Sequence, residues 1–128
     1  MTRARILVAE DHELMRGKVV RLLERDFEVV DAVTNGEAFL EAAALLKPDV
    51  CVVDISMPVL NGIEAASHLK DIHSTAKVIF LTIHSDSDSV GAAFKSGAAG
   101  YVFKARMAVD LVTAVREVLA GRTFLSSV

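Results

Sequence analysis

The chain has 128 residues, of which 52% are hydrophobic and 24% charged, and its formal net charge at pH 7 is −3. These values fit one compact domain, exclude a disordered chain and argue against a general nucleic-acid binder. The single cysteine, Cys51, excludes an internal disulfide and lies in an apolar run that predicts a core position. No apolar run approaches the ~20 residues of a membrane helix, and no secretory segment is evident, so we expect a cytoplasmic domain without membrane contact.

Five short apolar runs, each ended by polar or turn residues, are typical of strands that are buried on both faces. In chain order these runs are Ile6–Ala9, Val29–Val30, Val50–Val53, Val78–Leu81 and Tyr101–Phe103.

Between and after these runs, apolar residues recur with the period of a helix. The expected apolar faces of four helices, in chain order, are Met15, Val19, Leu22 and Leu23; Ala38, Ala42, Leu45 and Leu46; Ala65, Ala66 and Leu69; and Ala108, Leu111, Val112, Val115, Val118 and Leu119. Asn35-Gly36 and Asn61-Gly62 are expected to open the second and third helices. Lys47-Pro48 ends the second, because proline cannot continue a helix.

A weaker helix is expected over residues 86–96, between the fourth and fifth strands, and Gly97 is a suitable residue to end it. Ser87, Ser89 and Gly91 near its start all have lower helix propensity than alanine. Such a helix depends on tertiary contacts and could shift after a small change beside it. A short surface helix of ordinary low propensity explains the same residues.

The alternation of five strands with five helices predicts an α/β fold in which helices cover both faces of a parallel sheet. Right-handed crossovers make a doubly wound three-layer sandwich the natural architecture. No linker, internal repeat or biased segment divides the chain, so a single domain is expected.

Polar side chains follow four of the predicted strands, at the point where each strand ends. They are Glu10 and Asp11, Asp54, Thr82 and Lys104. Any one of them could be an ordinary loop residue. Because the carboxyl ends of parallel strands share one edge of the sheet, where ligands bind, the set is expected to form one shallow cleft.

Three neighbouring carboxylates repel one another unless a cation lies between them, and a hard divalent ion such as Mg²⁺ suits oxygen ligands. Lys104 and Thr82 could contact phosphoryl oxygens, or Lys104 could pair with Asp54 when no phosphate is bound. Asp54 is then the candidate nucleophile, because carboxylates form acyl phosphates.

At these positions the sequence resembles the receiver domain of two-component response regulators. The matching segments are Val8–His12, Val53–Pro58 with Asn61-Gly62, Leu81-Thr82 and Gly100–Lys104. The resemblance extends from about Ile6 to Leu125 and is strongest to the NarL/FixJ subfamily. It implies a flavodoxin-like sandwich with five helices and a five-stranded parallel sheet of order 2-1-3-4-5.

The resemblance implies a role for each residue of the acidic site. Asp54 matches the phosphoacceptor, which receives a phosphoryl group from a sensor histidine kinase. Glu10 and Asp11 match the acidic pair that holds Mg²⁺, and Asp54 and the backbone carbonyl of Ser56 would complete the protein ligands.

The resemblance also implies a switch. Thr82 and Tyr101 match the pair in which the hydroxyl turns toward the phosphoryl group while the aromatic ring rotates inward. Lys104 matches the lysine that pairs with the phosphoryl group. Phosphorylation would then shift the population between two packings of the domain.

By the same resemblance, residues 1–128 are one receiver domain, and a LuxR-type DNA-binding output domain lies outside this chain. The expected partners are a sensor histidine kinase and a second copy in a homodimer, with DNA contacted only through the output domain. We expect a regulator of transcription rather than an enzyme, with only its own phosphorylation and autodephosphorylation as chemistry.

Several residues depart from the family pattern. Glu10 stands where aspartate is commoner, and Ile83 is larger than the residue that usually follows the threonine. Ala105 replaces a proline that many receivers hold in a cis bond, which leaves the geometry of the Lys104–Ala105 bond open. Arg106 is no helix cap, so an irregular first turn is expected in the last helix.

Other polar residues have simpler interpretations. His12 is expected at the surface or as a cap, and His68 and His73 are expected to face solvent. Arg16, Arg21 and Arg25 are expected to form a solvated helix face, with a contact to another protein as the alternative.

Two other classes of function remain open. A pseudo-receiver would use the same fold as a protein-binding module without phosphorylation. A flavin binder would instead need a phosphate-binding loop after the first strand, where Glu10-Asp11 would repel phosphate. A dehalogenase-type phosphatase would need an aspartate where Ser56 stands.

Overall fold

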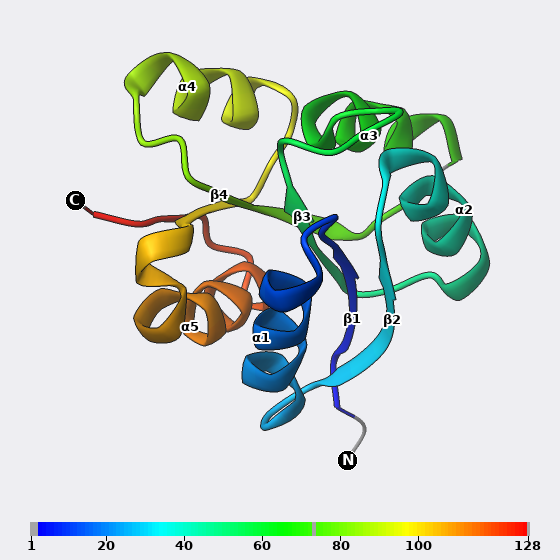
Figure 1. Cartoon of the computed structure of the whole chain (residues 1–128), viewed down its shortest axis with the longest axis horizontal. Coiled ribbons are helices and arrows are strands. Elements are labelled where there is room, and N and C mark those ends of the chain that lie inside the picture. The colour runs from blue at the N-terminus through cyan, green and yellow to red at the C-terminus, as the bar shows by residue number, and fades with distance from the viewer. Residues whose placement is uncertain (1–2, 73, 128) are drawn as a thin grey trace.

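The computed structural model describes residues 3–72 and 74–127, which fold around one sheet of parallel strands (Figure 1). The strands are β1 (Arg5–Ala9), β2 (Glu28–Val33), β3 (Val50–Asp54), β4 (Lys77–Thr82), β5 (Gly100–Phe103) and β6 (Phe124–Leu125). Their order is β2-β1-β3-β4-β5-β6. The predicted order of the first five strands is confirmed. The prediction of only five strands was wrong, because a two-residue strand is too short to show a period.

Five helices alternate with the strands as predicted. They are α1 (Glu13–Glu24), α2 (Gly36–Leu46), α3 (Gly62–His68), α4 (Ser87–Lys95) and α5 (Met107–Leu119), with the 3₁₀ turns η1 (Leu69–Ile72) after α3 and η2 (Lys104–Arg106) before α5. The side chains of Asn35 and Asn61 accept hydrogen bonds from backbone N–H groups in the first turns of α2 and α3, which confirms their predicted capping role. Among the described residues, no helix combines the length and apolarity that crossing a bilayer requires.

The helices form two layers, one on each face of the sheet (Figure 1). Residues Ile6 and Val8 of β1 pack in the apolar cluster that includes α1 and α5. Their neighbours Leu7 and Ala9 pack in the cluster that includes α2, α3 and α4. This alternation of side chains between two buried faces is why the strands appear as continuous apolar runs. The predicted doubly wound sandwich is thereby confirmed.

The buried faces of two helices differ from the prediction. In α2, Phe39, Ala42 and Ala43 are buried, whereas the predicted core residue Leu45 is 82% exposed. Phe39 has the largest apolar surface of the helix and turns its own face inward, which rotates Leu45 outward. In α5, Ala108 is exposed and Asp110 is buried.

The weak fourth helix is present, and its predicted end is confirmed. Asp86 precedes α4, and its carboxylate accepts hydrogen bonds from the backbone N–H and the hydroxyl of Ser89 at 2.9 Å each. Gly97 has a φ of +103°, a left-handed conformation that glycine adopts without strain. The capping carboxylate stabilises a helix whose own residues favour it little.

Cys51 lies in the core, as predicted, and burial raises the pKa of its thiol to about 12. We therefore expect iodoacetamide to leave the folded protein unmodified at neutral pH, because only the thiolate reacts and little of it forms. Intact mass measures the modification, and the protein unfolded in urea is the control that should gain one adduct. Rapid modification of the folded protein would contradict the assigned burial.

Candidate functional site

The strand register brings the predicted site residues to one edge of the sheet. Ala9 of β1 pairs with Val53 of β3, so Glu10 and Asp54 leave the two neighbouring strands side by side. On the other side, β4 pairs with β5 up to Thr82 and Phe103, the residue before Lys104. Thr82 and Lys104 line one hollow at this edge. The expected convergence of the strand ends is therefore present in the structure.

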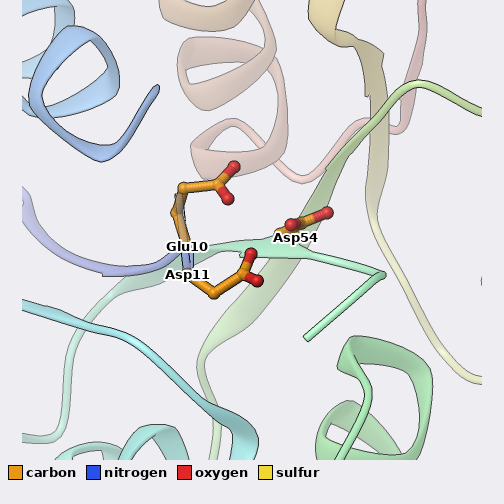
Figure 2. Close-up of side chains that lie close together, drawn as sticks. All are labelled: Glu10, Asp11 and Asp54. Atoms are coloured by element: carbon orange, nitrogen blue, oxygen red, sulfur yellow. The ribbon is translucent and has the colours of Figure 1, made fainter. Parts of the chain in front are cut away.

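The carboxylates of Glu10, Asp11 and Asp54 point toward a common space (Figure 2), with one oxygen of each residue within 4.8 Å of the others. Glu10 is 1% exposed and Asp54 is 5% exposed, while Asp11 is open to solvent. The Lys104 ammonium reaches into the same cluster, with Nζ at 2.9 Å from Glu10 Oε1 and 3.4 Å from Asp54 Oδ2. The shorter ion pair of Lys104 is thus with Glu10, and the expected pair with Asp54 is the longer one.

The charges of this cluster shift the acidity of its members. The pKa of Asp54 is raised to about 7, mainly by burial and next by the charge of Glu10, which raises the pKa more than the charge of Lys104 lowers it. Burial alone would lower the pKa of Lys104, but its contact with Glu10 and the charge of Asp54 outweigh burial and raise it. Lys104 is therefore a cation at neutral pH, whereas Asp54 is only partly ionised there in the metal-free site.

The site fits a hard divalent cation. Among the residues that the structure describes, Glu10 Oε1 is the buried polar side-chain atom without a well-aligned hydrogen bond, although the Lys104 ammonium lies at ion-pair distance. An oxygen in this condition, beside two further carboxylates, matches the ligands that Mg²⁺ prefers. The backbone N–H of Ser56 donates to Asp54 Oδ1 at 3.2 Å, and the role of the Ser56 carbonyl as a ligand stays a prediction.

Thr82 and Tyr101, the expected switch pair, are both buried and both contact the backbone of His84. Thr82 Oγ1 accepts a hydrogen bond from the His84 N–H at 3.1 Å, and the Tyr101 hydroxyl donates to the His84 carbonyl at 2.7 Å. The Tyr101 ring is fully buried and packs edge-on against Phe103. One residue of the β4–α4 loop therefore connects the two side chains.

Two of the departures from the family pattern can be followed in the loop between β5 and α5. No cis peptide bond occurs among the described residues, so the Lys104–Ala105 bond is trans. Arg106 makes no side-chain cap and a 3₁₀ turn precedes α5, which confirms the irregular start expected there.

Val59, in the loop after β3, has a φ of 71°, a strained conformation for a β-branched residue.

One arginine of α1 has a contact that sequence reasoning missed. Arg16 was expected on a solvated face, but its guanidinium donates to the carbonyl oxygens of Glu10 at 3.1 Å and Asp11 at 3.5 Å. The expectation was wrong because helical periodicity does not report contacts to the preceding loop. Arg16 fixes the backbone of the acidic pair.

Of the histidines, His12 caps α1, because its Nδ1 accepts a hydrogen bond from the Met15 N–H at 3.3 Å. A capping role was one of the two roles expected for His12, the other being a surface position. His68 is half-exposed and pairs with Asp71 at 3.0 Å, a local contact within the helix end. The prediction for His73 lies outside the described residues.

Comparisons with known proteins agree with this fold and site. Residues 6–116 match the family model described as "Response regulator receiver domain". The matched segment is a parallel α/β sandwich with a buried aspartate and an acidic pair at the carboxyl edge of its sheet, and this class of domain functions in signalling. The chain belongs to the response regulator receiver domain family, which confirms the resemblance inferred from the sequence.

Individual relatives are of the NarL/FixJ and LuxR types. The chain is 38% identical over 122 residues to the transcriptional regulatory protein DegU of Brevibacillus brevis, covering 94% of this chain and 52% of the relative. A solved two-component response regulator of the LuxR family from Aurantimonas sp. SI85-9A1 has a TM-score of 0.92 and 33% identity over 98% of this chain and 91% of that one. The receiver domain of the putative response regulator NarL from Mycobacterium tuberculosis has a TM-score of 0.90 and 31% identity, covering 95% of this chain and 100% of that one.

The chain spans little more than half the length of the first curated relatives that it matches, with 52%, 58% and 62% of each covered. Receiver domains of response regulators interact with histidine kinases and can dimerise, and response regulators are signalling proteins.

Proposed function

We propose that this chain is a phosphorylation-dependent switch that accepts a phosphoryl group on Asp54 from a sensor histidine kinase. The observation that supports this most strongly is the environment of Asp54. Its carboxylate is 5% exposed, ends a central strand and lies 3.4 Å from the Lys104 ammonium. A carboxylate with few solvent contacts and an adjacent cation suits attack on a phosphoryl group.

In the proposed transfer, an oxygen of Asp54 attacks the phosphorus of a phosphohistidine. The new O–P bond forms as the P–N bond breaks, and the imidazole leaves with the electron pair and takes up a proton. The Lys104 ammonium forms ion pairs with both Asp54 and Glu10. It can therefore give up one of these carboxylate partners and pair with a phosphoryl oxygen instead. The domain contributes positioning and charge neutralisation, which are the main contributions of proteins to phosphoryl transfer.

Mg²⁺ is the proposed cofactor, held by Glu10, Asp11, Asp54 and the backbone carbonyl of Ser56. Two observations support this assignment: the three carboxylate oxygens lie within 4.8 Å of one another, and the buried Glu10 Oε1 has the Lys104 ammonium at ion-pair distance but no well-aligned hydrogen bond. When bound, the ion would offset the negative charge of the carboxylates and of the incoming phosphoryl group. Arg16 keeps the acidic loop in place through its backbone carbonyls.

The proposed response to phosphorylation runs through Thr82 and Tyr101. A phosphoryl group on Asp54 carries about −1.5 to −2 charge in place of the single charge of the carboxylate, and it brings new acceptor oxygens beside Thr82. A hydroxyl drawn toward that group would alter its hydrogen bond with the His84 N–H, and the same residue's carbonyl accepts from Tyr101. A rearrangement of the β4–α4 loop would thereby alter the positions of α4, which follows the loop, and of Tyr101 on β5.

The output that we propose is transcription, through a LuxR-type DNA-binding domain in a longer protein. The relatives carry names of transcriptional regulators, and this chain covers little more than half of their length. The proposed setting is the cytoplasm, with a histidine kinase and a second copy of the receiver domain as partners.

The experiment is intact mass spectrometry after incubation with acetyl phosphate and Mg²⁺. The wild type is expected to gain one phosphoryl group, while Asp54→Asn and a wild-type sample with excess chelator gain none. Asp31→Asn is the matched control, because Asp31 is an exposed carboxylate on β2, away from the acidic cluster, and should behave as the wild type.

Equal mass gain in Asp54→Asn and the wild type would reject Asp54 as the acceptor. No gain in the wild type, together with no binding of beryllofluoride, would favour the pseudo-receiver, a protein-binding module that works without phosphorylation.

A further inference from the structure

Two buried polar side chains outside the acidic cluster form a connected network behind Lys104. Asp110 on α5 is 8% exposed, and Ser126, which follows β6, is 4% exposed. The Ser126 hydroxyl donates to Asp110 Oδ2 at 2.8 Å and accepts from the backbone N–H of Phe103 at 3.2 Å. The Ser126 hydroxyl thus satisfies the hydrogen-bonding needs of two buried groups, the Asp110 carboxylate and the Phe103 N–H. Such a buried hydrogen-bond network rigidifies the structure around it.

The network continues to the other side of Lys104. Arg106 Nε lies 2.9 Å from Asp110 Oδ2, and this bond lowers the pKa of Asp110, which is therefore charged at neutral pH. Phe103 precedes Lys104 directly and Arg106 follows it by two residues. The turn η2 that carries Lys104 is thus held at both ends by groups that meet at Asp110.

The position of Ser126 depends on the short strand β6. Its backbone N–H donates to the Tyr101 carbonyl at 3.0 Å, and the Phe124 N–H donates to the Ala99 carbonyl at 3.0 Å. These bonds fix residues 124–126 along the edge of β5, the strand that leads to Lys104. The segment after α5 therefore contributes a side chain to the surroundings of the site.

We propose that Asp110 and Ser126 are positioning residues, which act through Phe103 and Arg106 to hold Lys104 in place for phosphoryl transfer. This inference rests on the proposed function, since it assigns them a part in the same reaction. Without the Ser126 hydroxyl, the Phe103 N–H loses its acceptor and Asp110 loses a donor, both in a buried place. The turn that bears Lys104 then gains freedom, and the ammonium spends less time beside Asp54.

The test compares three single substitutions in phosphorylation by acetyl phosphate at saturating Mg²⁺. Ser126→Ala is expected to lower the rate constant about 10-fold, the scale of a small misplacement of a reacting group. Ser126→Thr keeps the hydroxyl and should restore the rate to within about twofold of the wild type. Ser127→Ala is the matched control, because the adjacent serine is exposed, and it should leave the rate unchanged.

Two further readouts separate positioning from a merely structural role. The Phe103 amide should exchange its hydrogen faster in Ser126→Ala, as measured by NMR without any phosphodonor. Affinity for Mn²⁺, measured by electron paramagnetic resonance, should not fall, because Glu10, Asp11 and Asp54 lie outside the network and a freer Lys104 ammonium competes less with a cation at Glu10 and Asp54. A variant with a lower melting temperature but a wild-type rate constant would overturn the proposal.

The outcomes also separate this proposal from the function on which it rests. A wild type that accepts no phosphoryl group rejects the proposed function and with it the positioning role. A phosphorylated wild type matched in rate by Ser126→Ala rejects the positioning role alone. Unchanged exchange of the Phe103 amide would reject the assigned hydrogen bond whichever result the kinetics gave.

Discussion

Replacing Gly62 with alanine is expected to lower the free energy of unfolding by about 3 kcal/mol, the range of a severe steric clash in a packed core. Gly62 begins α3 and packs against the backbone that carries the proposed phosphoacceptor. A Cβ at this position would overlap the Asp54 carbonyl oxygen and lie 2.9 Å from both the Asp54 carbonyl carbon and the Ile55 Cα. Because these atoms are backbone, no side-chain rotation can relieve the overlap.

Gly91 offers a matched control for this substitution. It also lies in a helix, α4, but a Cβ there would meet no atom within 4 Å. Gly91→Ala is expected to raise the free energy of unfolding by up to about 1 kcal/mol, because alanine has the higher helix propensity. Urea denaturation followed by circular dichroism measures both variants. A Gly62→Ala protein as stable as the wild type would show that α3 does not approach β3 so closely.

Replacing Asp54 with asparagine is expected to raise the free energy of unfolding by about 2 kcal/mol at about pH 8 without divalent metal. The carboxylate of Asp54 is buried next to Glu10, and burial raises its pKa to about 7. The charged carboxylate of Asp54 therefore destabilises the folded protein, and the neutral amide of asparagine removes this free-energy cost. We expect less than the ~4 kcal/mol of the whole pKa shift, because Lys104 loses one of its two carboxylate partners.

The sign of the pH dependence follows from the direction of the shift. The ordinary pKa of aspartate is 3.8, so between this value and about 7 the folded state keeps a proton that the unfolded state has lost. The contribution of Asp54 to stability falls as the pH rises through this window, and the loss is complete above it. The difference between Asp54→Asn and the wild type should therefore be small at about pH 4 and largest at about pH 8.

Urea denaturation in the presence of a chelator, repeated across this pH range, measures the effect. Asp31→Asn again serves as the control, with a change below about 0.5 kcal/mol expected for an exposed carboxylate. If Asp54→Asn were the less stable protein at about pH 8, the carboxylate of Asp54 would be stabilising in the metal-free fold and the argument from burial would fail.

Much of the fold was predictable because its signals are local. Continuous apolar runs such as Val50–Val53 indicate strands buried on both faces, and Asn35 and Asn61 mark helix starts through their own chemistry. The order of the first five strands followed from the resemblance to receiver domains. The two-residue strand β6 was missed, because its pairing depends on the neighbouring strand β5 rather than on a pattern of its own.

The acidic site was predictable for a related reason. Parallel strands present their carboxyl ends at one edge, so polar residues after Ala9, Val53, Leu81 and Phe103 were expected to meet there. Sequence reasoning identified the residues that meet but not their distances. That Lys104 lies closer to Glu10 than to Asp54 is a result of side-chain packing at that edge.

Local sequence patterns thus specify the kinds of element, their alternation and the chemistry that gathers at one edge of the sheet. Three features follow only from the packing of whole elements: Leu45 faces solvent, Arg16 holds the acidic loop, and Asp110 contacts Ser126. Propensity, periodicity and capping act within a few residues, so they can be inferred from a short stretch of chain. Contacts between distant segments depend on how whole elements pack, and no local pattern of residues records that packing.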